Sequence, residues 1–136
     1  MEDCIFCKII NGEIPCAKIY EDEKTLAFLD IGPIAEGHAL VVSKQHYETL
    51  LDTPEEEIKS IFSLAKKVAA AQQKALNNEG FNLLMNNKEV AGQVVPHIHV
   101  HIIPRNKRDG LFKGWPSKQY EEGKMEEVLG KIKKCF

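Results

Sequence analysis

The most informative stretch of the chain is Pro96-His97-Ile98-His99-Val100-His101-Ile102-Ile103-Pro104-Arg105. It holds three of the chain's five histidines, and one aliphatic residue separates each of them from the next. Because a β-strand turns alternate side chains to opposite faces, the histidines are predicted to share one face and Ile98, Val100 and Ile102 the other. The aliphatic face can be buried in a core, which leaves the imidazoles lining a cleft.

Imidazoles in such a row have two chemical uses. They could bind one metal ion, or one could attack an electrophile while its neighbours handle protons. Residues i and i+4 of a strand lie about 13 Å apart, whereas zinc holds nitrogen ligands at about 2.0–2.1 Å. His97 and His101 are therefore not expected to bind the same ion. A neutral imidazole is a good nucleophile at neutral pH, which favours covalent chemistry.

The composition is ordinary for a soluble globular protein. At 136 residues, with 43% hydrophobic and 28% charged residues, residues 1–136 are predicted to form one domain. The net charge of −2 offers no electrostatic basis for binding nucleic acid or an anionic membrane surface. No apolar run is long enough to cross a membrane. The acids Glu2 and Asp3 argue against a signal peptide, so a cytoplasmic location with reduced cysteines is expected.

Periodicity and turn residues place the other elements. The long helix is predicted to start at the capping box Thr53-Pro54-Glu55-Glu56 and to end before Asn77. A short N-terminal helix, capped by Asp3, is predicted to run to about Ile10. Strands are predicted over residues 17–21, 25–30, 37–44 and 81–86 and within the histidine stretch, and weak helical spacing marks 121–134. The expected fold is α+β, an antiparallel sheet of five strands with one long and one short helix, its core at about 4–105 and a tail at 106–136.

Cys4 and Cys7 form a C-x-x-C pair near the N-terminus. Such a pair is redox-active, metal-binding or coincidental. A redox role would need a thioredoxin-like alternation of strands and helices, which is missing here. A closed zinc site needs two more ligands, and the histidines could supply them. The two histidines outside the triad are His38, predicted to be structural at the start of its strand, and His46.

The pattern of alternating histidines and aliphatic residues resembles the signature of the histidine triad (HIT) family of nucleotide hydrolases and transferases. The other segments resemble its nucleoside phosphoramidase-like branch, of the bacterial type with an N-terminal C-x-x-C. The resemblance implies a HIT-like homodimer that cleaves at the α-phosphate of a purine nucleotide conjugate. It makes His99 the nucleophile of a covalent nucleotidyl-histidine and places His101 at the leaving group. Dinucleoside polyphosphate hydrolase, nucleotidyl transferase and a non-enzymatic nucleotide- or zinc-binding module remain alternatives.

The resemblance also implies a nucleotide-binding set. Asp30 would accept both ribose hydroxyls, and its apolar neighbours would pack against the base. The phosphate would lie on the loop that precedes the triad. The wall residues are Phe28, Leu29 and Ile31, and the phosphate-binding residues are Asn86, Gly92 and Gln93. Val94 departs from the pattern, because phosphoramidases of this branch carry a serine there that contacts the phosphate.

A structural zinc ion completes the predicted site. Members of the family with the cysteine pair resemble zinc proteins in which two histidines complete the site. The residues that match are Cys4, Cys7, His46 and His97. Two thiolates and two imidazoles favour zinc over magnesium or calcium.

Overall fold

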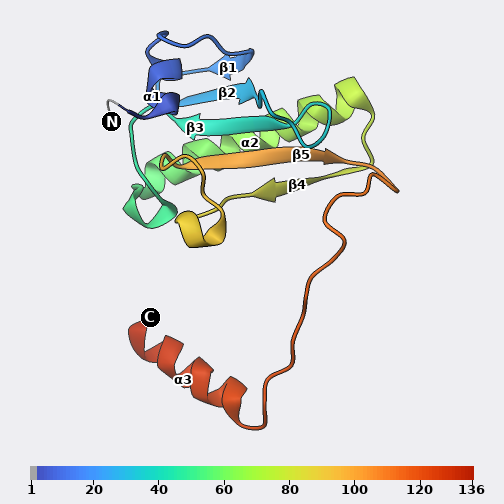
Figure 1. Ribbon diagram of the computed structural model, residues 1–136. Coiled ribbons are helices and arrows are strands. Elements are labelled where there is room, and N and C mark those ends of the chain that lie inside the picture. Colours follow the sequence, from blue (N-terminus) through green and yellow to red (C-terminus); the bar gives the residue numbers. More distant parts are fainter. Residues whose placement is uncertain (1–2) are drawn as a thin grey trace.

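The computed structural model describes residues 3–136, so Met1 and Glu2, at the start of the predicted domain, lie outside the described residues. The protein is built on a five-stranded antiparallel sheet with the strand order β1-β2-β3-β5-β4 (Figure 1). The elements are α1 (Ile5–Ile10), β1 (Lys18–Glu21), β2 (Thr25–Leu29), β3 (Ala39–Ser43), the 3₁₀ turn η1 (Leu50–Asp52), α2 (Glu55–Leu76), β4 (Gly80–Leu84), the 3₁₀ turn η2 (Glu89–Ala91), β5 (His99–Arg105) and α3 (Lys124–Cys135). The predicted α+β fold is confirmed.

One face of the sheet packs against α2, which runs behind the strands in Figure 1. The predicted aliphatic face of the triad stretch, Ile98, Val100 and Ile102, is buried there to 1% exposure or less. Full burial of one such side chain stabilises the fold by about 1.5–3 kcal/mol. The partners contributed by α2 are Ile61, Leu64, Ala65, Val68 and Ala69. The alternation of the triad stretch is therefore set by this core.

The other face of the sheet carries α1 and an open cavity. Phe6 of α1 packs on Leu26, Phe28, Leu40 and Val42 from β2 and β3. The helix is capped by Cys4, whose Sγ accepts a hydrogen bond from the backbone N–H of Cys7 at 3.4 Å. Cys4, rather than the predicted Asp3, is thus the N-cap. This cap also holds the two cysteines on one side of the helix.

The predicted capping box of the long helix is displaced. Helix α2 begins at Glu55 with Pro54 as its N-cap, and no side chain caps it. Thr53 instead donates its hydroxyl proton to the carbonyl of Thr49 at 2.7 Å. The box forms one turn earlier, where Thr49 and Asp52 bond reciprocally around η1. The C-terminus is as predicted, since Asn77 ends the helix with a left-handed φ of 55°.

The triad does not lie on one strand. Strand β5 begins at His99, and His97 lies in the bend before it. The bend follows Pro96, and the backbone N–H of His97 bonds to the carbonyl of Val95 at 2.8 Å. His97 is 0% exposed. The prediction of three imidazoles lining one open cleft is therefore wrong for His97, because α1 covers its ring, although that ring packs against Phe6 on the same face as His99.

Beyond β5 the chain extends away from the sheet and ends in α3, which Figure 1 shows apart from the domain. The helix starts at Lys124, three residues later than the predicted 121. Its apolar residues Met125, Leu129 and Ile132 are 50–60% exposed. Among residues 3–136, no helix is long and apolar enough to span a membrane.

Candidate active site and metal centre

A cavity of about 1030 Å³ opens on the sheet face opposite α2. Its walls come from α1, from the ends of β2, β3 and β5, and from the loop before the triad. The predicted site residues that line it are Phe28, Leu29, Asp30, Ile31, Asn86, Gly92, His99 and His101. Val94 and His38 line it as well, whereas Gln93 does not. Folding therefore brings together side chains that are separated by more than 70 positions in the sequence.

The orientation of His99 is set by its neighbour in the triad. Its Nδ1 lies 2.6 Å from the backbone carbonyl oxygen of His97. Because a carbonyl can only accept, Nδ1 must carry the proton, and in the neutral ring Nε2 holds the lone pair. Burial lowers the pKa of His99 below the usual imidazole value. His99 is thus a neutral imidazole with an unprotonated Nε2 at pH 7.

His101 belongs to a chain of two imidazoles. The backbone N–H of Ile34 donates to Nδ1 of His38 at 3.2 Å, so the proton of a neutral His38 is on Nε2. This Nε2–H points to Nδ1 of His101 at 2.9 Å. Nδ1 of His101 is then the acceptor, and its proton lies on Nε2. Burial lowers the pKa of His101 to about 4 and that of His38 below the usual value, so both are neutral at pH 7.

His38 was predicted to be structural only. It does bond to the backbone, but it also orients His101, which lies 63 positions away. Sequence analysis offers no local signal for this pairing beyond the presence of a histidine at the start of the neighbouring strand. Asp30, His38 and His101 also lie close enough to hold a metal. The hydrogen bonds favour a proton-orienting role instead, because His38 uses Nε2 as a donor.

Asp30 lies directly after β2, at the rim of the cavity. Its Oδ1 accepts a hydrogen bond from the backbone N–H of Gly32 at 2.8 Å, and its Oδ2 lies 3.6 Å from Nε2 of His38. The flanking Leu29 and Ile31 are exposed, while Phe28 is largely buried and forms part of the cavity wall. A carboxylate acceptor beside an apolar shelf is the arrangement predicted for binding a ribose and its base.

The loop before the triad forms the opposite rim. Nδ2 of Asn86 donates to the carbonyl of Gly92 at 3.2 Å. Gly92 has a φ of 99°, and a Cβ at this position would lie 3.3 Å from Asn86 Nδ2. Glycine therefore suits this position for both conformation and space. Val94, two residues further along the chain, is 89% exposed and also lines the cavity.

The predicted metal ligands Cys4, Cys7, His46 and His97 converge on one point beside α1. Their ligand atoms all lie within 4.8 Å of one another. Nδ1 of His97 is 3.3 Å from Cys4 Sγ and 3.6 Å from Cys7 Sγ, and Nδ1 of His46 is 3.3 Å from Cys7 Sγ. Tetrahedral zinc with these ligands would place sulfur and nitrogen about 3.5 Å apart. The four side chains therefore fit a zinc ion.

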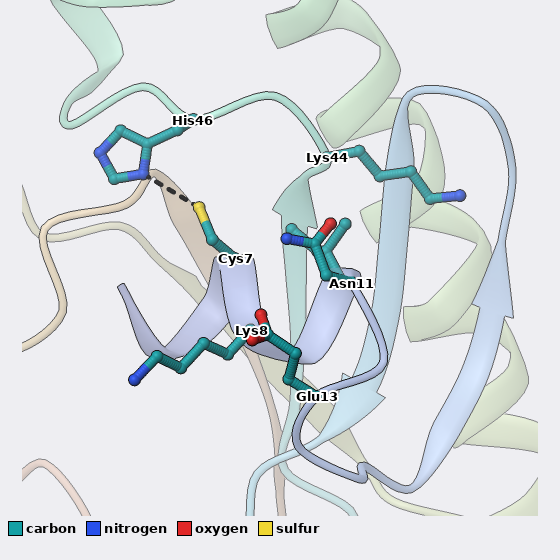
Figure 2. Close-up of a pocket in the computed structure, with 7 residues that line it drawn as sticks. Cys7, Lys8, Asn11, Glu13, Lys44 and His46 are labelled. Carbon is teal, nitrogen blue, oxygen red and sulfur yellow. Dashed lines mark hydrogen bonds between the residues drawn. The ribbon is translucent and has the colours of Figure 1, made fainter. Parts of the chain in front are cut away.

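Two further features of the cluster agree with metal binding. Nε2 of His97 lies 2.7 Å from the carbonyl of Ser43, so it carries the proton and leaves Nδ1 unprotonated toward the cysteines. Burial, together with the neighbouring Cys4, raises the pKa of the Cys7 thiol to about 11, a cost that a bound cation would reverse. Figure 2 shows Cys7 and His46 facing each other in a pocket that is also lined by Lys8 and Lys44. Cys7 and His46 are thus accessible from outside the domain, whereas Cys4 and His97 are buried.

Comparison with known proteins gives a family match over most of the chain. The model of the HIT domain matches residues 11–108. The adenosine 5′-monophosphoramidase hnt1 of Schizosaccharomyces pombe is 47% identical over 135 residues, which cover 96% of this chain and 98% of that relative. Adenylylsulfatase HINT3 of Arabidopsis thaliana is 48% identical over 110 residues, or 81% of this chain. The chain spans only 56% of the length of HINT3.

Solved structures match over the full length. The crystal structure of a HIT family protein from Bacillus anthracis superposes with a TM-score of 0.91 and 43% identity, covering 99% of this chain and 98% of that one. A Zn-bound histidine triad family protein from Mycobacterium smegmatis superposes with a TM-score of 0.78 and 34% identity, covering 99% of each chain.

Proposed function

Because this chain belongs to the HIT domain family, we propose that it is a nucleotide hydrolase that cleaves at the α-phosphate of a nucleotide conjugate. The match over residues 11–108 and the adenosine monophosphoramidase among the relatives support a hydrolase of the phosphoramidase-like branch. The observation that carries the proposal is the hydrogen bond between Nδ1 of His99 and the carbonyl of His97. It holds an unprotonated nitrogen ready for attack.

In the proposed reaction, Nε2 of His99 attacks the α-phosphorus as the bond to the leaving group breaks. The product is a covalent nucleotidyl-histidine, which water then hydrolyses to release the nucleotide. No base is needed to activate this nucleophile, because burial lowers the pKa of His99 and keeps the ring neutral. Asp30 would accept the ribose hydroxyls, with Phe28, Leu29 and Ile31 against the base, and Asn86 and Gly92 would hold the phosphate.

His101 is proposed to serve the leaving group. The chain from Ile34 through His38 places the His101 proton on Nε2, which makes that atom a hydrogen-bond donor to the departing atom. His38 is then a positioning residue that acts through His101. Without it, His101 could adopt the opposite tautomer and present a lone pair instead.

The charge of the cavity bears on the leaving group. The described residues that line it include no lysine or arginine, and Asp30 is their one carboxylate. A polyphosphate leaving group would enter this environment without a compensating cation, which is unfavourable. The cavity therefore supports a neutral or cationic leaving group, such as an amine, over the alternative of a dinucleoside polyphosphate.

A second candidate substrate is an adenylyl sulfate. The adenylylsulfatase among the relatives favours it, and Val94 lacks the hydroxyl that the resemblance implies for phosphoramidases, but its sulfate leaving group is anionic and meets the same unfavourable charge as a polyphosphate. Comparing turnover of an AMP–amine conjugate, adenylyl sulfate and a diadenosine polyphosphate on one preparation would rank the three leaving groups.

We further propose that Cys4, Cys7, His46 and His97 hold a structural zinc ion. The convergence of the four ligand atoms and the Zn-bound relative support this site. The ion would tie α1 to the end of β3 and to the bend that precedes β5. When bound, it supplies a fixed charge that keeps both cysteines as thiolates.

The quaternary structure is likewise proposed, as a homodimer. The edge strand β4 presents Phe81 and Leu83, which are 44% and 42% exposed. Its outer edge is unpaired within the described chain. A second copy that pairs there would cover both side chains.

Trapping the covalent intermediate tests the proposed reaction. After brief incubation with an AMP–amine conjugate and acid-free quenching, intact-mass spectrometry should detect one adenylyl group per chain in the wild type. A His101→Gln variant should retain the adduct, because its nucleophile is intact, whereas His99→Asn should carry none. A wild type that binds AMP but never carries the adduct would instead be a non-enzymatic nucleotide-binding module.

A further inference from the structure

We propose that Gln93 is a positioning residue, which fastens the phosphate loop (residues 86–94) to the backbone of residues 47–50. The resemblance to the family implies a direct contact between Gln93 and the phosphate. The inference rests on the proposed function, because the loop affects catalysis only if it holds a nucleotide phosphate. It assigns Gln93 a different role within that function.

The side chain of Gln93 is already fully engaged inside the protein. It is 7% exposed and does not line the cavity. Its Oε1 accepts a hydrogen bond from the backbone N–H of Lys88 at 2.7 Å, and its Nε2 donates to the carbonyl of Glu48 at 2.7 Å. A rotation toward a phosphate would break both bonds and leave two polar groups unsatisfied.

The loop needs such a fastening because part of it is strained. Lys88 has a φ of 76°, in the left-handed region that a residue with a Cβ adopts only at a cost. Gln93 bonds to Lys88 twice: its side chain accepts from the Lys88 N–H, and its backbone N–H donates to the Lys88 carbonyl at 3.1 Å. Gln93 thereby holds Lys88 in this conformation.

A second side chain makes the same connection. Oδ1 of Asn87 accepts a hydrogen bond from the backbone N–H of Leu50 at 2.7 Å. Asn87 is not among the residues that line the cavity. Loop and segment are therefore joined at two points, one from Gln93 to Glu48 and one from Asn87 to Leu50.

Residues 47–50 are a suitable anchor because they are also bonded to the triad. The carbonyl of Tyr47 accepts from the backbone N–H of Ile98 at 2.7 Å, directly before His99. The side chain of Thr49 is buried and bonded to Asp52. The same segment is thus bonded both to the phosphate loop and to the residue before the nucleophile, and Gln93 makes one of the bonds to the loop.

The test compares Gln93→Leu with Gln73→Leu, an exposed glutamine of α2 that serves as the control. In Gln93→Leu, amides 86–93 should exchange hydrogen faster, and the Kd for AMP should rise about tenfold or more, because Lys88 N and Glu48 O lose their partners. The Kd for adenosine, which lacks the phosphate, should stay the same. Gln73→Leu should match the wild type in all three measurements.

Asn87 provides an independent pair of variants. Asn87→Leu removes the acceptor for Leu50 N–H and should reproduce the AMP defect and the faster exchange. Asn87→Asp keeps that acceptor and should restore both toward the wild type. These variants decide the question even if Gln93→Leu does not fold.

Two outcomes would overturn the proposal. Weak AMP binding by Gln93→Leu with unchanged loop exchange, and normal AMP binding by Asn87→Leu, would mean that Gln93 contacts the phosphate directly. Unchanged AMP affinity and exchange in both leucine variants would mean that neither residue positions the loop. Because neither readout requires turnover, failure of the proposed hydrolase activity would be seen separately, as AMP binding without an adenylyl adduct.

Discussion

The backbone carbonyl of His97 accepts a hydrogen bond from Nδ1–H of His99 at 2.6 Å, while the His97 side chain points into the cysteine cluster. One residue thus links the candidate metal centre to the candidate nucleophile. Any change that moves His97 also changes the acceptor that fixes the tautomer of His99. The last of the predictions below depends on this link.

Replacing the nucleophile should abolish turnover. His99→Asn is expected to lower kcat by several orders of magnitude, since no other described group offers an equivalent lone pair at the α-phosphorus. The ring of His99 is 5% exposed and packs edge-on against Phe6 at 5.0 Å, so some loss of thermal stability is expected too. Steady-state kinetics, AMP binding and a melting curve separate the two effects. Substantial residual kcat in a folded variant would rule out covalent catalysis at His99.

Asp30 should discriminate between sugars. Asp30→Asn is expected to weaken AMP binding more than binding of 2′-deoxy-AMP, because the proposed contact is to the ribose hydroxyls. A hydrogen bond to a charged group contributes about 1.5–3 kcal/mol. Calorimetric titration of both nucleotides into wild type and variant measures the difference. An equal loss of affinity for the two nucleotides would mean that Asp30 only accepts the Gly32 N–H in a turn and does not contact the ribose.

Stability should fall in mild acid. The pKa of folded His101 is about 4, whereas an imidazole in the unfolded chain titrates near 6.5. Between these values the unfolded chain binds more protons, so the free energy of unfolding decreases as the pH falls from about 6.5 to about 4. Above pH 7 the contribution of His101 to the free energy of unfolding does not change with pH. The burial of His38 lowers its pKa and acts in the same direction.

Urea denaturation at several pH values measures how the free energy of unfolding changes with pH. His101→Asn removes the titrating group and should flatten the dependence between pH 4 and 6.5 relative to the wild type. An identical pH dependence in the two proteins would show that His101 does not contribute.

Zinc should co-purify with the protein and stabilise it. Elemental analysis of tag-free protein is expected to find about one zinc per chain, and Cys4→Ser/Cys7→Ser should lose both the metal and thermal stability. The matched control is Cys16→Ser/Cys135→Ser, which changes two cysteines outside the cluster. Metal-free wild type whose stability equals that of the first double variant would exclude the site.

Removing zinc should also affect the nucleophile through His97. Chelation is expected to increase hydrogen exchange in the bend at 95–98 and to slow adenylylation of His99, while the His38–His101 pair is unaffected. Single-turnover kinetics before and after chelation, with zinc added back, measures this coupling. Adenylylation at an unchanged rate in zinc-free protein would show that the metal centre holds α1 in place but does not affect His99.

Local patterns were sufficient for the fold class and for the position of most of its elements. The alternation of Ile98, Val100 and Ile102, the end of α2 at Asn77 and the start of β2 at Thr25 each depend on a few consecutive residues. Backbone geometry acts over that range, so the sequence alone determined them. The grouping of Cys4, Cys7, His46 and His97 was reached through resemblance to a family, not through spacing.

Tertiary structure decided the features that depend on contacts between distant segments. The side chain of His97 meets the cysteines because α1 packs on that face of the sheet, and its buried ring donates a hydrogen bond to the carbonyl of Ser43. His38 meets His101 only because β3 and β5 are neighbours in the sheet. The side chain of Gln93 donates a hydrogen bond to the carbonyl of Glu48, 45 positions away. Hydrogen bonds of this kind depend on which segments pack side by side. The periodicity of a short stretch of sequence does not predict that packing.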